Sequence, residues 1–356
     1  FASVKITGRP TDELLQDIAP TWVTGLKGDR LMRWGNGTFK FPRPIRRLVC
    51  LWGDHILPIE LAGLTAARIT QGHRVMHPDP IALQKATDYP RLLADAGYVQ
   101  PDRDIRASQI QAQAISVAKK AGGVAVIPDD LLEEVTDLVE WPTAVVGQFE
   151  PEFLELPAPA IKSVMVTHQR YFAVSPPDKP AELLPCFVTI SNGDPAKSEA
   201  IAAGNGRVIR ARLADGRFFY TEDQKQPLDT FVPKLDKVTF VEGLGSMKDK
   251  VDRIQQIAAW IGAALQVSDR EEAHIGQTAY LCKADLLTQM VYEFPEMQGI
   301  MGRDYLLRSG ADPEIATGVE QHYWPLGAGD RLPDTLTGQV VGIADRLDSL
   351  VGLFKL

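Results

Sequence analysis

Two short segments of the chain combine a histidine and an arginine with aromatic or apolar neighbours. They are Gly72-His73-Arg74, in ITQGHRVMHP, and Thr167-His168-Gln169-Arg170, in MVTHQRYF. An arginine can bind a phosphate through two hydrogen bonds, and an aromatic ring can stack on a nucleotide base. His73, Arg74, His168, Gln169 and Arg170 are therefore candidates for contacts with RNA. The alternative for each segment is a strand end that carries a half-buried histidine.

Further arginines are concentrated in two stretches of the chain. Residues 30–47 carry six positive charges and no acid, and residues 204–217 carry four arginines against the single acid Asp215. Planar guanidinium groups bind phosphate oxygens in pairs, so these stretches predict contacts with an RNA backbone. The alternative is an ordinary solvated surface. The candidates in these stretches are Arg33, Arg43, Arg46, Arg47, Arg207, Arg210 and Arg212.

In the last third of the chain, Asp285, His322 and Asp345 occur in an order that resembles the metal ligands of HD-domain phosphohydrolases. Those enzymes need a His, an adjacent His-Asp pair and a distant Asp, because imidazoles and carboxylates together hold a metal that activates water. Here Ala284 stands where the His of the pair would be, although His274 could supply the first ligand. We expect an HD-like scaffold with no metal, and metal-dependent phosphohydrolysis is the alternative.

Other catalytic motifs are missing from the sequence. The glycine-rich segments GNGRV (204–208) and GLGSMKDK (243–250) fit neither GxxxxGK[ST] nor GxGxxG, so we expect loops that precede helices. There is also no GxSxG or HExxH motif. Three cysteines lie far apart among apolar residues without a CxxC pair, which predicts free, buried thiols in a reducing cytoplasm. They are Cys50, Cys186 and Cys282.

Composition sets the broad class of the protein. With 356 residues, 45% of them hydrophobic and 24% charged, the chain indicates a globular protein of two or three domains and excludes general disorder. The sequence contains no run of about 18 apolar residues, so it predicts no membrane-spanning helix. The net charge of −8 has the wrong sign for a general nucleic-acid binder, but acids gather in residues 129–140 and a basic face would be hidden in the sum. Because the chain begins at Phe1 without a signal-peptide pattern, we expect a fragment.

The elements that must position these residues are mixed in the first two thirds of the chain. Residues 45–52 and 55–61 predict a hairpin around a type II′ turn at Gly53-Asp54. The predicted helices are 81–96, 105–121 and 131–139, the last with Leu131, Val135 and Leu138 on its apolar face, and the predicted strands are 162–174 and 185–191. Interleaving without a regular βαβ order favours an α+β fold.

From Gly243 onwards the pattern is helical. Ser246 and Asp249 form a capping-box-like start, and apolar residues then recur at spacings of three and four from Val251 to Leu265. Further helical stretches cover 279–294 and 337–354, and the last one reaches Leu356 without a breaker. We place a domain boundary at about residue 242 and expect the parent protein to continue beyond Leu356.

Together these segments closely resemble the beta subunit of the bacterial heterotetrameric glycyl-tRNA synthetase. The similarity depends on many phrases that occur in the family's order along nearly the whole chain. They are LMRWG (31–35), FPRPIRRLVCLWG (41–53), GHRVM (72–76), LLEEVTDLVEWP (131–142), THQRYF (167–172), GNGRVIRARLADGRFFYTEDQK (204–225), FVEGLGSMKDKVDRI (240–254), KADLLTQMVYEFPEMQGIMGRDY (283–305), and QHYWPLGAGDRLPDT to IADRLDSLVGLF (321–354).

The resemblance implies a fold and a division of labour. Residues 1–242 would form most of an α+β domain similar to the editing-type domain of phenylalanyl-tRNA synthetase, and residues 243–356 an all-helical, degenerate HD-like domain, truncated at its end, with Ala284, Asp285, His322 and Asp345 at the former ligand positions. We expect a fragment that lacks the family's acidic N-terminal segment and its C-terminal anticodon-binding region. The aminoacylation site would belong to the alpha subunit, so we expect no catalytic residue here.

The resemblance also implies partners and cofactors. The beta subunit would hold tRNA-Gly in a cytoplasmic alpha2beta2 heterotetramer, and the complete enzyme would attach glycine using ATP and Mg²⁺ in the alpha subunit. This chain would bind no cofactor itself and no membrane. Two alternatives remain open: hydrolytic editing of mischarged tRNA by the first domain, suggested by analogy of fold, and a purely structural role beside the alpha subunit.

Overall fold

The computed structural model describes residues 8–35 and 37–355. Two of the predictions refer to Phe1 and Leu356, and both residues lie outside the described residues. The chain divides into two compact units. The first comprises Phe1–Lys120, Ile127–Val146 and Val188–Ala202, and the second comprises Ala121–Val126, Gly147–Phe187 and Ala203–Leu356. Residue 242 lies between two short strands of the second unit, and the domain boundary at this position stays a prediction.

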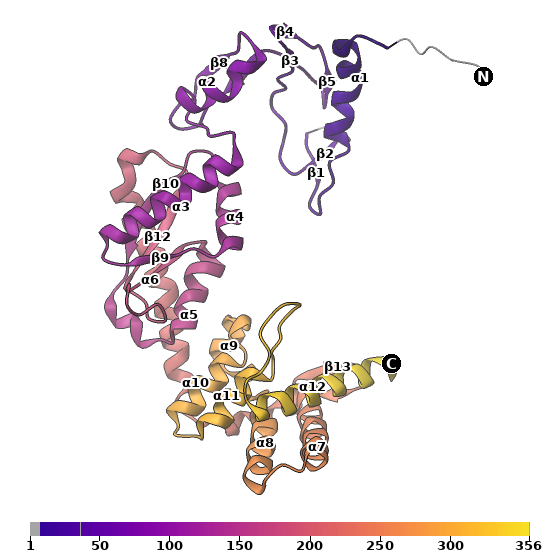
Figure 1. The fold of residues 1–356 in the computed structure, drawn as a ribbon, viewed down its shortest axis with the longest axis vertical. Coiled ribbons are helices and arrows are strands. Elements are labelled where there is room, and N and C mark those ends of the chain that lie inside the picture. The colour runs from indigo at the N-terminus through magenta and orange to yellow at the C-terminus, as the bar shows by residue number, and fades with distance from the viewer. Residues whose placement is uncertain (1–7, 36, 356) are drawn as a thin grey trace, which may run out of the picture. The chain divides into compact units, whose positions relative to one another are not determined.

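The N-terminal part of the first unit consists of one helix and a series of very short antiparallel strand pairs (Figure 1). The helix is α1 (Thr11–Thr24). The pairs are β1 (Met32–Arg33) with β2 (Lys40–Phe41), β3 (Leu51–Trp52) with β4 (His55–Ile56), β5 (Glu60–Leu61) with β6 (Leu64–Thr65), and β7 (Ile69–Gln71) with β8 (Pro80–Ala82).

The predicted hairpin at Gly53-Asp54 is confirmed, but its strands are shorter than expected. Leu51 pairs with Ile56 and Trp52 with His55. Gly53 has a φ of 63°, and Asp54 has no positive φ. A type II′ turn requires this combination, with a positive φ at its first central residue only. Residues 60–61 belong to the next pair, because a second turn with positive φ at Ala62 and Gly63 follows them.

Helices α2 (Tyr89–Asp95), α3 (Arg103–Lys120) and α4 (Asp129–Leu138) follow. The prediction for 105–121 is confirmed, whereas 81–96 is helical only from a short 3-10 turn at Ala86–Asp88 onwards, since its first residues form β8. In α4, Leu131 and Val135 are buried as predicted, but Leu138 is 63% exposed. The last turn of α4 therefore presents its leucine to the outside of this unit.

A four-stranded sheet has the strand order β10-β12-β11-β9. Its strands are β10 (Thr143–Gln148), β12 (Cys186–Ser191), β11 (Phe172–Ser175) and β9 (Val124–Val126), and β11 pairs with β9 in antiparallel register. The predicted strand at 185–191 is confirmed. Together with the short hairpins and the many helices, this sheet confirms the α+β class.

The predicted strand at 162–174 is wrong over most of its length. Residues Ala158–Ser163 form helix α5, Val164–His168 form a π-helical turn, and only the end of the segment enters β11. Ala160, Ile161, Val164 and Met165 are all buried, which is the spacing of a helical face. Packing of this face in the core outweighs the strand preference of the β-branched residues.

The segment GNGRV (204–208) is also not a loop. It lies inside α6 (Ser198–Asp223), a 26-residue helix. A Cβ atom at Gly206 would lie 2.9 Å from the backbone oxygen of Gln148, so the glycine allows a close approach between helix and strand. The segment GLGSMKDK (243–250) does contain the predicted loop, since it closes β13 (Thr239–Val241) and β14 (Gly245–Ser246) immediately before a helix.

From Met247 onwards all described elements are helical, which confirms the prediction except at its start, since the helical pattern was expected from Gly243 and β14 occupies Gly245–Ser246. The helices are α7 (Met247–Leu265), α8 (Asp269–Leu281), α9 (Gln289–Glu293), α10 (Ile300–Arg308), α11 (Pro313–Gln321) and α12 (Leu336–Lys355). Figure 1 shows α7 and α8 side by side with α12 crossing them. The Ser246–Asp249 capping box is present, whereas the predicted helix 279–294 is broken by a 3-10 turn at Ala284–Leu287. Among residues 8–35 and 37–355, no helix combines the length and the apolar character needed to cross a bilayer.

Candidate functional site

His73 has a structural role in this fold, which argues against the predicted RNA contact. Its side chain is buried, and Nδ1 accepts hydrogen bonds from the backbone N–H groups of Val75 and Met76, each at 3.2 Å. Nε2 therefore carries the proton and donates to the backbone oxygen of Asn192 at 2.8 Å. Both ring nitrogens are used inside the first unit, and neither is available to a ligand.

The basic residues near His73 behave differently, because they are exposed. Arg33 lies on β1, and Arg43, Arg46, Arg47 and Arg74 lie in the loops that follow. Arg43 donates to the oxygen of Pro42, and Arg47 donates to the side chain of Gln71. Within the described part of the chain, none of these five arginines forms an ion pair with a carboxylate. Their positive charge is thus uncompensated by nearby acids.

The segment 167–170 is partly occupied by internal contacts. His168 is half-buried, with Nε2 at 3.4 Å from a carboxylate oxygen of Glu296 and its ring edge-on to Phe294. Burial opposes ionisation of Glu296, but the Ser163 hydroxyl and His168 outweigh it and lower the pKa of this carboxyl. Arg170, at a φ of 57°, donates to the oxygen of Thr167. Gln169 is also half-buried. Of the two interpretations of this segment, the half-buried histidine agrees better with the structure than an RNA contact does.

The arginines of α6 lie beside acids. Arg210 forms an ion pair with Glu150 at 2.6 Å, Arg212 with Glu293 at 3.7 Å, and Arg217 with Glu152 at 3.1 Å. Arg207 is exposed and forms no ion pair with any residue that the structure describes. The helix therefore presents alternating charges rather than a positive surface. Among its four arginines, only Arg207 resembles the candidates of the first unit in being exposed and in forming no ion pair with a described acid.

Two of the HD-like positions, His322 and Asp345, form a buried cluster around a residue that the sequence did not single out. Lys283 precedes Ala284, and its Nζ atom lies 2.9 Å from Nε2 of His322 and 2.8 Å from Oδ2 of Asp345. His322 Nε2 and Asp345 Oδ2 are themselves 4.0 Å apart. The topology thus brings His322 and Asp345 together as predicted, but an ammonium group lies between them.

The electrostatics of this cluster follow from burial and from Lys283. Burial, and then the positive charge of Lys283, hold the pKa of His322 well below its usual value, so the ring is neutral. Burial would raise the pKa of Asp345, but the positive charges of Lys283 and Lys250 outweigh burial and lower it, so Asp345 is ionised. A neutral imidazole and a carboxylate are both suitable acceptors for an ammonium group.

Neighbouring charges extend the cluster towards the first turns of α7. Lys250 is buried, and its Nζ atom lies 2.7 Å from Oδ1 of Asp345 and 3.1 Å from Oδ2 of Asp348. Arg253 also pairs with Asp348. Three cations and two carboxylates therefore hold α7, α12 and the 3-10 turn together, and each carboxylate contacts two cations.

Asp285 and His274 lie apart from this arrangement. Asp285 is buried and accepts hydrogen bonds from the N–H groups of Gly299 and Gly302. Burial raises its pKa to about 6 against these two donors. His274 contacts Glu314 and Asp312 instead, so the expectation that it could supply a first metal ligand is wrong. Ala284 is fully buried in the apolar core.

A divalent metal does not fit this donor set. The two groups that could bind it, His322 and Asp345, already share the Lys283 ammonium, and Ala284 offers no ligand atom. In the described residues, no group of three or more His, Cys, Asp or Glu side chains has the arrangement of a metal site. A lysine beside a degenerate His-Asp pair is the sequence signal that would have indicated this.

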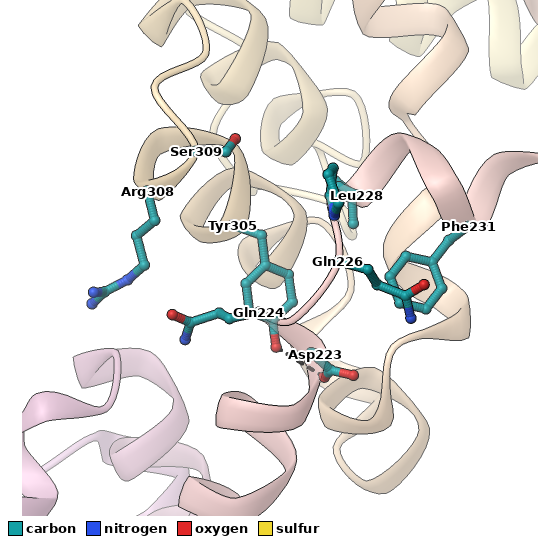
Figure 2. Close-up of a pocket in the computed structure, with 9 residues that line it drawn as sticks. Asp223, Gln224, Gln226, Leu228, Phe231, Tyr305, Arg308 and Ser309 are labelled. Atoms are coloured by element: carbon teal, nitrogen blue, oxygen red, sulfur yellow. Dashed lines mark hydrogen bonds between the residues drawn. The ribbon is translucent and has the colours of Figure 1, made fainter.

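A small pocket of about 210 Å³ lies where α6 ends against α10 (Figure 2). Figure 2 shows the Tyr305 hydroxyl directed at Asp223, which also accepts from the N–H groups of Gln289 and Met290. Arg308 pairs with Asp304 and lies over the Tyr220 ring. Since these charged groups bond to one another, the pocket is a structural junction of helices.

The thiols offer no nucleophile. Cys186 and Cys282 are buried as predicted, whereas Cys50 is only half-buried, and all three are free. Burial raises the pKa of each thiol, in the case of Cys282 to about 12. A raised pKa disfavours the reactive thiolate.

Comparison with known proteins agrees with the resemblance seen in the sequence. A family model described as "Glycyl-tRNA synthetase beta subunit" matches residues 1–356. The chain is 54% identical over 360 residues to the glycine–tRNA ligase beta subunit of Picosynechococcus sp. and covers 50% of it, and 46% identical over 354 residues to that of Moorella thermoacetica, covering 51%. The chain thus spans about half the length of the curated relatives it matches.

Proposed function

Because the chain belongs to the glycyl-tRNA synthetase beta subunit family, we propose that it is a tRNA-holding, non-catalytic part of a glycine–tRNA ligase. Its partners are an alpha subunit, in a cytoplasmic alpha2beta2 heterotetramer, and tRNA-Gly. The alpha subunit carries the aminoacylation site and uses ATP and Mg²⁺, and this chain binds neither. The overall reaction is the ATP-dependent attachment of glycine to tRNA-Gly.

The exposed arginine surface of the first unit is the observation that carries this proposal. Arg33, Arg43, Arg46, Arg47 and Arg74 are exposed and pair with no described acid, although acids outnumber bases in the chain as a whole. A surface of unpaired guanidinium groups suits the phosphate backbone of a folded RNA, which it can hold without reading sequence. The α6 arginines, which pair with acids, are weaker candidates, apart from Arg207.

The finer domain assignments belong to the same proposal. The Lys283–His322–Asp345 cluster supports an HD-like scaffold that has lost its metal chemistry, since a lysine ammonium cannot activate water as a Lewis acid does. The similarity of the first domain to the editing-type domain of phenylalanyl-tRNA synthetase is inferred from the family resemblance alone. Neither metal-dependent phosphohydrolysis nor hydrolytic editing is favoured by any group described above.

The test is the binding of tRNA-Gly across a salt series, with the alpha subunit present and absent. Reversing charge in Arg43→Glu/Arg46→Glu/Arg47→Glu should weaken binding and flatten the dependence of log K on log [salt], because each lost phosphate contact lowers the slope by about 1. The matched control is Lys119→Glu/Lys120→Glu/Lys197→Glu, which makes the same charge change at exposed lysines of the same unit.

The two variants separate specific contacts from general charge. Equal losses in both would mean that only net charge matters, and an unchanged slope in the arginine variant would contradict the assigned surface. Binding that requires the alpha subunit in every case would support the purely structural alternative, in which this chain docks the partner and contributes no RNA contact of its own.

A further inference from the structure

The Lys283 ammonium has a complete set of acceptors in the helical core. Nζ lies 2.9 Å from His322 Nε2, 2.8 Å from Asp345 Oδ2 and 4.0 Å from the centre of the Tyr323 ring. The Lys283 side chain is only 6% exposed. An ammonium group has three N–H donors, so an imidazole nitrogen, a carboxylate oxygen and an aromatic face together satisfy it away from water.

The two acceptor side chains, His322 and Asp345, are each held in place by a second contact. His322 Nδ1 lies 2.6 Å from the oxygen of Val319, so Nδ1 carries the ring proton and the Nε2 lone pair faces Lys283. Metal-binding histidines are commonly fixed in the same way, by an N–H to a backbone carbonyl. The second oxygen of Asp345 is held at 2.7 Å by Lys250. Both acceptors are therefore oriented towards one point, where Nζ lies.

We propose that the Lys283 ammonium takes the place of a divalent cation in this core, and that the core accepts a metal ion only when this amine is removed. The cation is covalently attached to the chain and is in place as soon as the chain folds. The link from Lys283 to His322, at the end of α11, and to Asp345, in α12, therefore requires no metal supply. The cations that would replace it are first-row divalent ions that accept nitrogen and oxygen ligands, such as Mn²⁺ and Zn²⁺. This inference does not depend on tRNA binding.

Two substitutions of Lys283 that differ in the space they leave provide the test. Lys283→Ala removes the charge and opens a cavity beside His322 and Asp345, whereas Lys283→Met removes the charge and fills much of the same volume. Both should lower the Tm of the full chain by roughly 6–20 °C, because a buried ion pair loses one partner. Millimolar Mn²⁺ or Zn²⁺, or methylammonium as a free amine, should then raise the Tm of Lys283→Ala but not of Lys283→Met or the unaltered chain.

Two further measurements keep the proposal open to contradiction. Adding His322→Gln to Lys283→Ala should abolish the metal response, since it removes the imidazole ligand. In the unaltered chain, EDTA should leave the Tm unchanged and metal analysis should find less than one equivalent. A drop in Tm with EDTA, a stoichiometric metal, or a folded Lys283→Ala variant that responds to neither cation would overturn the proposal. If Lys283→Ala does not fold, the EDTA and metal analyses of the unaltered chain still test whether the core holds a metal ion when Lys283 is present.

Discussion

The Nε2 atom of His73 lies 2.8 Å from the backbone oxygen of Asn192, although 119 positions separate the two residues. The side chain of Asn192 in turn accepts hydrogen bonds from the backbone N–H groups of Glu140 and Trp141. Three distant segments of the first unit therefore meet at one polar junction, in which the His73 side chain is buried. The neighbouring Arg74 is exposed and takes no part in it.

Replacing His73 should affect stability, whereas replacing its neighbour Arg74 should affect tRNA binding. His73→Ala should lower the free energy of unfolding by about 2–3 kcal/mol, because it leaves the Asn192 oxygen and two backbone N–H groups without partners. Arg74→Ala should leave stability nearly unchanged but weaken tRNA-Gly binding and reduce its salt slope by about 1. Urea unfolding and tRNA titration of both variants measure this. A stable His73→Ala variant with weakened tRNA binding would restore His73 as a contact residue.

The sequence could predict local features but not the direction in which side chains point. The Ser246–Asp249 cap was predictable, because all of its hydrogen bonds span three residues. His73 and Arg74 could not be told apart, because the partner of His73 comes from residue 192. Lys283 was missed for the same reason, since its acceptors lie 39 and 62 positions away. Lysine is normally a surface residue, and it is partners distant in sequence that explain the burial of Lys283.

Local preference was also misleading where tertiary packing decides the outcome. The segment KSVMVTHQRYFAV has the composition of a strand, yet Val164 and Met165 are buried in a π-helical turn. The glycines of GNGRV suggested a loop, yet they lie in a long helix that needs a small residue at one position. In both cases the deciding neighbour is distant in sequence, so composition alone gives the wrong element.

The two glycines of that segment provide a matched pair. Gly206→Ala should destabilise the protein by about 1–3 kcal/mol, because its Cβ would lie 2.9 Å from the Gln148 backbone oxygen, which has little room to move. Gly204→Ala should stabilise it by about 0.5–1 kcal/mol, because only the tip of the Arg207 side chain lies within 4 Å and alanine favours the helix. Thermal or urea unfolding measures both. Destabilisation by Gly204→Ala would mean that this turn is not helical.

The buried carboxyl of Asp285 should make stability fall as pH rises. Its pKa is about 6 in the folded chain against an ordinary value of 3.8, so between these values the folded state holds a proton that the unfolded state has released. The free energy of unfolding of the unaltered chain, relative to Asp285→Asn, should therefore decrease by roughly 2–2.5 kcal/mol from pH 4 to pH 7 and level off above. Asparagine has no such proton, and its side-chain oxygen can still accept from Gly299 and Gly302.

Asp345 would produce the opposite slope, because its pKa is lowered and its contribution is lost as pH falls. It is present in both proteins, so its effect cancels in the difference between them. Urea unfolding at several pH values gives that difference directly. A difference that is flat or that rises with pH would show that Asp285 titrates at or below its ordinary pKa in the folded chain.

The arginines of α6 should differ in their contribution to RNA binding according to their ion pairs. Arg207 has no carboxylate partner among the described residues, whereas Arg210 lies 2.6 Å from Glu150. A phosphate that binds Arg210 must compete with this carboxylate, so Arg207→Ala should weaken tRNA-Gly binding more than Arg210→Ala and reduce the salt slope by about 1. Both side chains are exposed, and stability should change little in either variant.

Glu150→Gln is the complementary substitution, since it frees Arg210 without altering it. If α6 faces the RNA, Glu150→Gln should strengthen binding and steepen the salt slope, and Arg210→Ala should then reverse the gain. If Arg207→Ala and Glu150→Gln both bind tRNA-Gly like the unaltered chain, α6 does not contact the RNA. The RNA contacts of this chain would then lie in the first unit alone, where the five candidate arginines form no ion pair with a described acid that would compete with phosphate.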